Sequence, residues 1–373
     1  MGGISEFILQ KIAEFGPRPS ASEKEREFLL FLKDMLASFG LTTNLETFRA
    51  PATYTWAYLV FFLGLAQAGL LCVTAPVWAA LSSLTLLVLL YFELATFPVV
   101  SLLFRTRTSA NVLGKHGEHP QVIILAHADS ATPSIFFHPR FVVHPRLSLL
   151  LFISSACVIT GVSVALAFVN VPPLRFAALL PSLYLLFLAS GHVHREFSMA
   201  SSPGGNDNGS GVAAALAIAQ TLKAEGIPFL IVLTGAEESG TWGALHLLAR
   251  HRTELLGKPI VNLDNIGIGT LTAATKEGMW RVYGAPQELL AEFQAMRLPY
   301  LAFQPYLGLS TDATPLLARG FKALTLIAFG EHGLPVNWHW YTDTAEAVDR
   351  ENVKRVVDLV TLWAKAKHHG MVP

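Results

Sequence analysis

Two long stretches with almost no charged side chains constrain the fold of this 373-residue chain more than any other feature. Between Pro51 and Phe104, Glu93 is the only side chain that ionises near neutral pH. A helix that crosses a bilayer needs about 20 predominantly apolar residues. The stretch has room for two such helices, at Thr55–Val73 and Trp78–Leu94, with Pro76 in the turn between them. We therefore predict a transmembrane hairpin here.

A second apolar region follows at Leu147–Val169 and Phe176–Ala189, interrupted by Asn170–Arg175, which holds two prolines and an arginine. It predicts a second hairpin, so four transmembrane helices are expected. The alternative is a pair of buried hairpins in a large soluble protein, but such runs exceed ordinary core helices in length. The N-terminus, MGGISEFILQKIAEF, has acidic residues and no basic region, so we do not expect a signal peptide.

Composition excludes several classes of protein. Charged residues make up 14% of the chain, against about 25% in ordinary soluble domains. Lys+Arg and Asp+Glu both number 27, and without a basic excess nucleic acid is not an expected partner. The two cysteines, Cys72 and Cys157, lie in apolar runs, which excludes a disulfide framework and a thiolate zinc site.

The rest of the chain predicts an α/β fold with a mostly parallel mixed sheet flanked by helices. Short, continuously apolar runs are typical of strands buried on both faces; they are Gln121–Ala126, Pro228–Thr234, Ile260–Leu263 and Ala323–Phe329. Helical patterns precede, separate and follow them, at 5–15, 21–39, 210–224, 240–251, 286–296, 312–319 and 345–367. We assign residues 1–50, 107–130 and 198–373 to this domain, 51–106 to the first hairpin and 131–197 to the second.

Polar motifs follow the predicted strands. They are His127-Ala-Asp129, Asn206-Asp207-Asn208-Gly209-Ser210-Gly211, Glu237-Glu238, Asp264, and His339 with Asp343. Each alone is commonly a turn, a helix cap or a solvated surface group. Because carboxyl ends of parallel strands meet in one crevice, the motifs together supply two imidazoles and several carboxylates, a donor set that suits Zn²⁺.

The order His-x-Asp, Asp-Asn-x-Ser-Gly, Glu-Glu-x-Gly, Asn-Leu-Asp and His-x-x-x-Asp-Thr resembles the M28 family of zinc aminopeptidases. The N-terminal FGPRPSASEKEREFLLFL is similar to that family's leading segment. The resemblance covers about residues 1–50, 108–130, 200–275 and 305–367, outside both apolar hairpins. It implies a zinc aminopeptidase-like fold, peptide substrates and two zinc ions.

The resemblance also implies a role for each motif residue. Asp207 would bridge the two zinc ions. One ion would also bind His127 and Asp264, and the other Glu238 and His339. Glu237 would be the general base, and Asp129 would accept a hydrogen bond from the free ring nitrogen of His127.

Other residues leave alternatives open. Ser310-Thr311-Asp312-Ala313 departs from the family's Ser-Asp-His, so Asp312, with Trp338 and Asp343, is expected only to support the site or contact substrate. Trp338 before His339 resembles glutaminyl cyclases, single-zinc relatives, so one-metal acyl transfer is one alternative and a non-catalytic membrane receptor or scaffold another. His332 rivals His339 as a ligand.

Residues beside the apolar helices suggest how the protein lies in a membrane. Interfacial roles are expected for His192, His194 and the His-Pro-Arg pair at 138–140 and 144–146. Glu93 either reaches the interface or marks a polar path. Arginines cluster on the domain side of the hairpins, at Arg49, Arg105, Arg107, Arg140, Arg146 and Arg195, and only Arg175 lies in the far turns.

The positive-inside rule then predicts a multi-pass protein with a cytoplasmic catalytic domain. Because the second hairpin leaves after Asp129 and returns before Asp207, the site should lie near the bilayer and favour apolar peptides there. The alternative is that the hairpins only attach the enzyme to the membrane.

Overall fold

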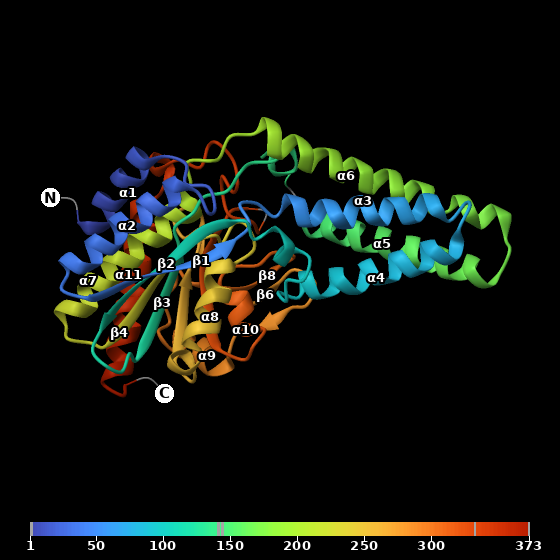
Figure 1. Ribbon diagram of the computed structural model, residues 1–373. Coiled ribbons are helices and arrows are strands. Elements are labelled where there is room, and N and C mark those ends of the chain that lie inside the picture. Colours follow the sequence, from blue (N-terminus) through green and yellow to red (C-terminus); the bar gives the residue numbers. More distant parts are fainter. Residues whose placement is uncertain (1–2, 140–141, 143–144, 332, 372–373) are drawn as a thin grey trace.

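The computed structural model describes residues 3–139, 142, 145–331 and 333–371. Figure 1 shows two parts: a helix-covered sheet at one end and, projecting from it, a bundle formed by the long helices α3 to α6. In the described part of the chain the strands are β1 Thr42–Ala50, β2 Arg107–His116, β3 Val122–His127, β4 Phe229–Thr234, β5 Pro259–Leu263, β6 Thr270–Gly278, β7 Tyr283–Gly284, β8 Ala302–Leu307 and β9 Lys322–Phe329.

The helices confirm the periodicity of the sequence to within a few residues at most ends. They are α1 Ile4–Phe15, α2 Glu23–Ser38, α3 Thr55–Leu71, α4 Pro76–Leu94, α5 Pro145–Phe168, α6 Leu179–Ser198, α7 Gly211–Ala224, α8 Trp242–Leu255, α9 Gln287–Ala295, α10 Ala313–Leu317 and α11 Arg350–His368. Short helical turns lie at η1 Ser101–Phe104, η2 Ile135–Phe137, η3 Pro172–Phe176, η4 Gly205–Ser210 and η5 Ala345–Ala347.

The sheet has the order β1-β2-β4-β3-β5-β9-β6-β7, with β8 paired to β6. The four strands predicted from apolar runs form its parallel centre, β4-β3-β5-β9. At the flanks the prediction of a mostly parallel sheet needs correction, because β2 is antiparallel to β1 and β4, and β6 is antiparallel to β9 and β7. The strands β1, β2, β6, β7 and β8 were not predicted. Of these, β1 and β6 are rich in threonine and other polar residues, without a continuous apolar run.

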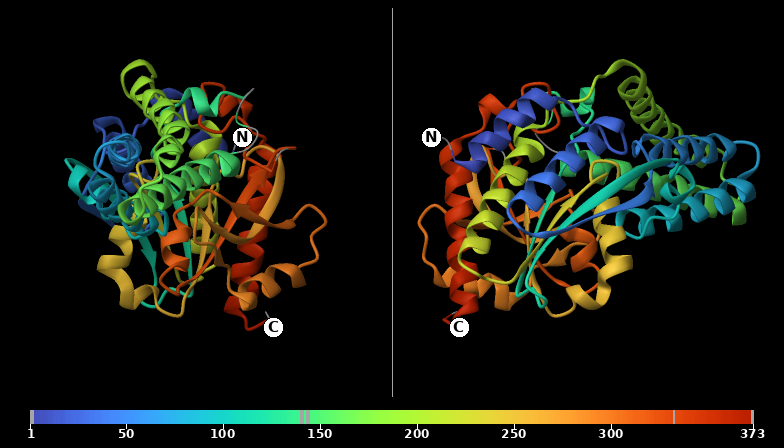
Figure 2. Two further views of the ribbon diagram at one scale, coloured as in Figure 1. Left: turned by 90° about the vertical axis from the view of Figure 1, so that its right-hand side faces the viewer. Right: turned by 60° about the vertical axis from the view of Figure 1, so that its left-hand side comes forward.

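Strand β3 shows why a central strand is apolar throughout. Ile124 and Ala126 pack into a core that includes residues of α1, α2, α7, α9 and α11. Ile123 and Leu125 point to the other face, where they join the core beneath α8 and α10. Successive side chains of a strand alternate between faces, so a sheet covered on both faces buries every residue. The right-hand view of Figure 2 shows α1, α2, α7 and α11 together on one face.

The bundle has its own apolar core, to which α3, α4, α5 and α6 all contribute. Three of its helices are long and apolar enough to cross a membrane, at Pro76–Leu94, Arg146–Phe168 and Pro172–Ser198, and their apolar windows are only 22–39% buried. Helix α3, with 17 residues, is a shorter apolar helix. The remaining expected span, α3, is thus shorter than the other three.

Glu93 lies at the domain end of α4, and the interfacial role expected for it stays a prediction. Its carboxylate Oε2 accepts hydrogen bonds from the backbone N–H groups of Val99 and Val100, both at 2.9 Å. These two donors lie in the loop that follows α4, so the carboxylate closes the turn at the domain end of that helix. These two contacts give the one charged side chain of the first apolar stretch a local structural role.

Arg195, near the end of α6, joins the two hairpins to each other at the base of the bundle. Its guanidinium is 4% exposed. It donates to the Oγ1 atoms of Thr53 and Thr55 at 2.8 and 3.0 Å, where α3 begins, and its Nε donates to the Thr132 carbonyl oxygen at 3.1 Å. The same guanidinium lies over the Tyr54 ring, 4.4 Å from its centroid. One side chain therefore fixes three chain segments at the base of the bundle.

We predict that Arg195→Ala lowers the free energy of unfolding by about 1–3 kcal/mol, because it leaves a buried carbonyl and two hydroxyls without their donor. Thermal and denaturant unfolding in detergent, followed by circular dichroism, measures the change. The matched control is Arg26→Ala, since Arg26 is exposed on α2 and its loss should change stability by no more than about 0.5 kcal/mol. Equal stability of the two variants would contradict the anchoring role.

Candidate metal centre

The five predicted ligands come from five segments that meet at the carboxyl edge of the parallel strands. His127 is the last residue of β3, and Asp207 lies in the turn Gly205–Ser210 before α7. Glu238 follows β4, Asp264 follows β5, and His339 lies in the loop after β9. Parallel strands point their carboxyl ends the same way, which is why positions 212 residues apart in sequence share one crevice.

Asp207 is the centre of this arrangement. Its Oδ1 lies 3.1 Å from Nε2 of His127, which is also 3.8 Å from Oδ1 of Asp264. Its Oδ2 lies 3.3 Å from Nε2 of His339, which is 3.1 Å from Oε2 of Glu238. The two oxygens of one carboxylate thus face two different histidines, each accompanied by a further carboxylate.

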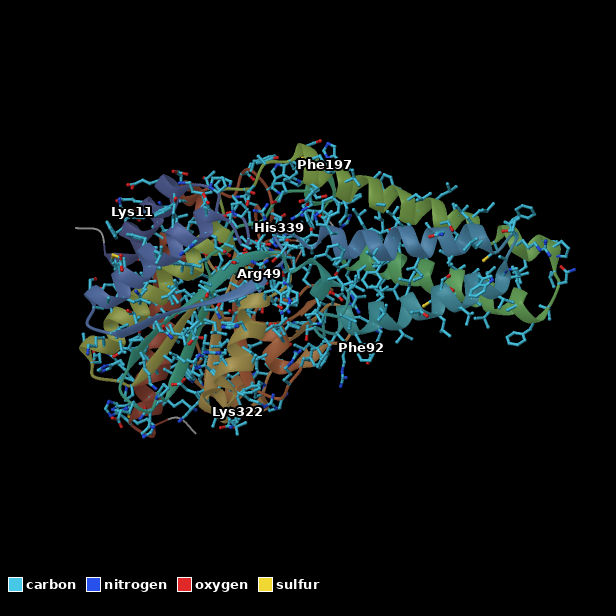
Figure 3. The ribbon with its side chains drawn as sticks, in the orientation of Figure 1. Lys11, Arg49, Phe92, Phe197, Lys322 and His339 are labelled. Carbon is cyan, nitrogen blue, oxygen red and sulfur yellow. The ribbon has the colours of Figure 1, made fainter. Side chains whose placement is uncertain are left out.

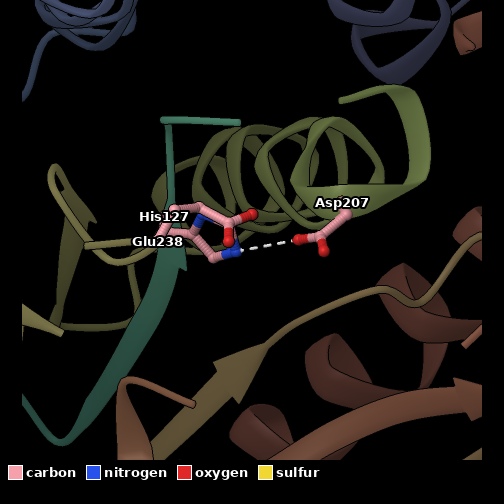
Figure 4. Close-up of side chains that lie close together, drawn as sticks. All are labelled: His127, Asp207 and Glu238. Carbon is pink, nitrogen blue, oxygen red and sulfur yellow. Dashed lines mark ion pairs between the residues drawn. The ribbon is translucent and has the colours of Figure 1, made fainter. Parts of the chain in front are cut away.

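The donor set fits a metal ion. One ligand atom each from His127, Asp207 and Glu238 lies within 4.8 Å of the others, and Figure 4 shows these side chains turned toward one another. Oε1 of Glu238 is buried and has no hydrogen-bond partner in the described part of the chain. A buried carboxylate oxygen without a donor is costly, and a divalent cation among these oxygens and imidazoles would satisfy it.

The pKa shifts of the site residues also indicate a site for a cation. Burial alone would lower the pKa of His339, but the carboxylates of Glu238 and Asp207 raise it to about 9. Burial also opposes protonation of His127, and hydrogen bonds with Asp129, Asp207 and Asp264 still raise its pKa well above the ordinary value. Burial raises the pKa of Glu237 well above its usual range, against the effect of His127. The crevice therefore strongly favours bound positive charge.

Asp129 holds the glutamate loop in place. Its carboxylate, fully buried, accepts the backbone N–H groups of Glu237 and Glu238 at 3.1 and 3.0 Å and the hydroxyl of Ser20 at 2.6 Å. Nδ1 of His127 lies 3.2 Å from the Asp129 backbone oxygen and 3.4 Å from its Oδ1. Asp129 thus orients the histidine and the segment that carries the two glutamates.

Asp343 does the same for Asp207. Its carboxylate accepts the backbone N–H groups of Asn206 and Asp207 at 2.5 and 3.1 Å. Burial and the nearby Asp207 charge raise the pKa of Asp343 to about 8, and those hydrogen bonds act in the opposite direction. The carboxyl lies behind the backbone of Asp207 and fixes the direction in which that residue projects.

Asp312 and Trp338 lie beside the ligands. The Asp312 carboxylate accepts a short hydrogen bond from the Thr234 hydroxyl, and burial raises its pKa to about 7. Trp338 is 7% exposed, and its ring centroid lies 4.1 Å from that of His339. Phe137 packs edge-on against both rings. These aromatic contacts limit the movement of the His339 ring.

Three supporting residues escaped the sequence analysis. Glu25 of α2 accepts the Ala236 N–H at 2.6 Å and the Ser109 hydroxyl at 2.8 Å, just before the two glutamates. Arg18 is buried and donates to the carbonyls of Ala128 and Gly204, which belong to two different ligand loops. Arg18 and Ser20 lie in FGPRPSAS, the segment noted for its family resemblance, so a signal existed for them but not for Glu25.

The other histidines considered as possible ligands are His332, His192 and His194. His332 lies outside the described residues. His192 and His194 are two positions apart on α6 and do not form a pair, because such positions lie on different sides of a helix. His194 is exposed, whereas His192 lines the cavity beside the metal centre. The interfacial role expected for both histidines stays a prediction.

Comparison with known proteins identifies a related family. The model of peptidase family M28 matches residues 186–364, which contain Asp207, Glu237, Glu238, Asp264 and His339. This match confirms the resemblance to family M28. No curated protein matches the sequence.

Solved structures share the fold at low sequence identity. A zinc aminopeptidase from Bacillus subtilis is 15% identical with a TM-score of 0.58, covering 98% of this chain and 94% of that chain. A Zn-dependent exopeptidase from Parabacteroides distasonis is 16% identical with a TM-score of 0.56, with coverages of 98% and 96%. Glutaminyl cyclase from Porphyromonas gingivalis is 16% identical with a TM-score of 0.55, with coverages of 98% and 97%.

The α/β domain therefore has the mixed, helix-flanked sheet of zinc aminopeptidases and glutaminyl cyclases. The family match supports a metallopeptidase-like enzyme, and zinc is the metal of the aminopeptidases that share this fold.

We predict that Asp343→Asn weakens zinc binding about 10- to 100-fold, the usual cost of losing a group that orients a metal ligand. The amide presents an NH₂ group to one of the two backbone donors, in place of a carboxylate oxygen. Competition with a chromogenic chelator measures the affinity. The control is Asp349→Asn at the start of α11, where the side chain only caps Glu351 and asparagine caps equally well. Unchanged zinc affinity in Asp343→Asn would contradict the role assigned to it.

Proposed function

We propose that the protein is a membrane-anchored metallo-aminopeptidase that binds two zinc ions bridged by Asp207 and removes N-terminal residues from peptides. The observation that carries the proposal is the division of Asp207 between two histidines, Oδ1 toward His127 and Oδ2 toward His339. On this assignment His127 and Asp264 complete one site, and Glu238 and His339 complete the other. A single-ion site would leave one of these pairs of donors without a cation.

When bound, zinc polarises a substrate carbonyl and lowers the pKa of a coordinated water. The chain's own contribution is Glu237, whose carboxylate lines the cavity between the ligands. Its backbone N–H is fixed by Asp129, so the side chain is held where it can take a proton from water and return it to the leaving amine. The raised pKa of the buried Glu237 carboxyl suits a group that must hold this proton for part of the reaction.

A glutaminyl-cyclase-like acyl transfer with one zinc ion is the second candidate. It is favoured by the Trp338 ring against His339 and by the cyclases that share the fold. Metal content separates the two candidates, because the cyclase reaction predicts one ion per chain where the aminopeptidase predicts two.

We predict that Glu237→Gln lowers kcat for amino-acid amides about 100- to 10,000-fold while two zinc ions per chain remain bound, because glutamine removes a base and not a ligand. Asp207→Ala should lose both ions together with activity. Plasma emission spectroscopy gives the metal content and a coupled amine assay gives the rate. Glu288→Gln, on the exposed side of α9, is the matched control. Retained hydrolysis by Glu237→Gln would remove Glu237 from the base role, and one ion in the wild type would favour the cyclase.

We further propose that α3 to α6 form two transmembrane hairpins. Their outward side chains are large and apolar, including Trp78 at 69%, Phe168 at 85% and Leu180 at 77% exposure. Water would hydrate this belt at high cost, whereas lipid would cover it. Arg175 lies at the far end of the bundle, bonded to the Val73 carbonyl oxygen and Asn170. Those arginines of the hairpin flanks that the structure describes lie at the domain end, where Arg105 lies over the Trp242 ring and Arg146 lies beside Gly308. This distribution supports a cytoplasmic domain.

Reporter fusions test this orientation. A fusion after Ala75, in the far turn, should report the outside of the cytoplasmic membrane, and a fusion at the C-terminus should report the cytoplasm. The expected result follows from the excess of arginine on the domain side. Reporters on the same side, or in the reverse orientation, would contradict the proposed topology.

A further inference from the structure

The metal centre opens into a cavity that extends between the helices of the bundle. The cavity has a volume of about 620 Å³ and is lined at one end by His127, Asp207, Glu237 and His339. Side chains of α3, α5 and α6 line the other end. Figure 3 shows His339 at the junction of the two parts of the molecule. The bundle therefore contributes walls to the same space that contains the ligands.

We propose that this part of the bundle is the substrate pocket of the enzyme and that it selects peptides whose first residues are aromatic or branched aliphatic. The proposal rests on the aminopeptidase function argued above and names its substrate class. It also assigns the two hairpins a second role besides attachment to the membrane.

Helix α3 supplies an aromatic stripe. Tyr54, just before the helix, Tyr58 and Phe62 line the cavity and are spaced four residues apart, which places them on one helix face. At 1.5 Å per residue, the eight positions from Tyr54 to Phe62 extend about 12 Å along the helix. An extended peptide rises about 3.3 Å per residue, so the stripe matches the length of several residues and exceeds that of one side chain.

The opposite walls are also apolar. Leu149 and Phe152 of α5 and Leu188 of α6 line the cavity, and the ring centroids of Phe152 and Phe62 are 4.8 Å apart. Phe136 of η2 closes the side next to α6. It packs there because residue 191 is glycine: a Cβ at Gly191 would lie 2.3 Å from the Phe136 ring. The walls thus present apolar surface to any side chain that enters.

His192 supplies the polar partner that a peptide backbone needs. Its Nδ1 lies 3.0 Å from the Leu188 carbonyl oxygen, which can only accept, so Nδ1 carries the proton and Nε2 of the neutral ring keeps a lone pair. Among the described residues Nε2 has no hydrogen-bond partner, and the ring lines the cavity between Phe62 and Tyr58. An unpaired N–H of a buried peptide is costly, and this nitrogen can accept it.

The decisive experiment compares substrates on variants of the purified full chain in lipid nanodiscs. Phe62→Ala should lower the kcat/KM ratio of Phe- or Leu-initiated tripeptides to Ala-initiated ones by at least about tenfold, since an apolar pocket discriminates by contact area. The control is Leu63→Ala on the same helix, where the side chain is 49% exposed and points away from the cavity. An unchanged ratio in Phe62→Ala, or an equal change in Leu63→Ala, overturns the proposal.

His192→Phe keeps the aromatic volume and removes the acceptor, so it serves if Phe62→Ala fails to fold. It should raise KM for apolar tripeptides about 3- to 10-fold, the cost of one hydrogen bond. Amino-acid amides lack the second peptide N–H, so their KM should change little. Equal effects on tripeptides and amides would overturn the role of His192.

A binding measurement separates this inference from the proposed function. Calorimetric titration of Glu237→Gln with Phe-Leu-Ala and Ala-Ser-Ala amides needs no turnover. Tighter binding of the apolar peptide, lost in the double variant with Phe62→Ala but kept with Leu63→Ala, supports the pocket even if the wild type hydrolyses neither peptide. Equal binding of the two peptides, with hydrolysis intact, overturns the pocket and leaves the aminopeptidase proposal standing.

Discussion

The negative charge concentrated at the carboxyl edge of β4, β3 and β5 is the constraint on which the rest of the structure depends. Asp207, Glu237, Glu238 and Asp264 converge there with two histidines. Such a cluster is unstable without a cation. Further buried polar groups hold the ligand loops in place. Asp129 and Asp343 grip the backbone of the ligand loops by their N–H groups. Glu25 holds Ala236, at the entrance of the glutamate loop, which has a positive φ of 52°. The ligand carboxylates thus form an inner layer, and the carboxylates that hold the backbone of the ligand loops form an outer layer around it.

The sequence predicts the inner layer well and the outer layer partly. The ligands follow continuously apolar strands, and a strand buried on both faces is easy to recognise because every residue is apolar. The flanking strands β1 and β6 carry many polar or small residues and could not be distinguished from loops. Asp129 and Asp343 share motifs with the ligands, so the sequence predicts them near the site. It does not predict that their carboxylates accept hydrogen bonds from the backbone N–H groups of the ligand loops. Glu25 approaches from a helix 211 residues before Ala236, and only the tertiary packing of α2 brings it there.

The apolar stretches show the same limit. Their composition predicts helices of membrane type, and three of the four are long enough to span. Composition does not tell which helix face meets its neighbours and which meets lipid. The stripe of Tyr54, Tyr58 and Phe62 has helical spacing, yet on an all-apolar helix such spacing does not distinguish a cavity wall from a packed core. The rotation of α6 about its axis decides whether His192 faces the cavity or the outside of the bundle. The composition of an apolar helix does not give that rotation.

The connections between bundle and site explain how one influences the other. The chain leaves the site after Asp129 and returns before Asp207, and the two connecting segments are hydrogen-bonded to each other at residues 130–132 and 201–202. Ser202 N–H donates to the Ala131 carbonyl oxygen at 2.8 Å, and the Ser130 hydroxyl donates to the Ser202 carbonyl oxygen at 3.0 Å. Arg195 adds a contact from α6 to Thr132. These bonds join the base of α6 to the segments that lead to His127 and Asp207. The bundle therefore meets the metal centre through short, hydrogen-bonded connections, which a separate anchor joined by a flexible linker would lack.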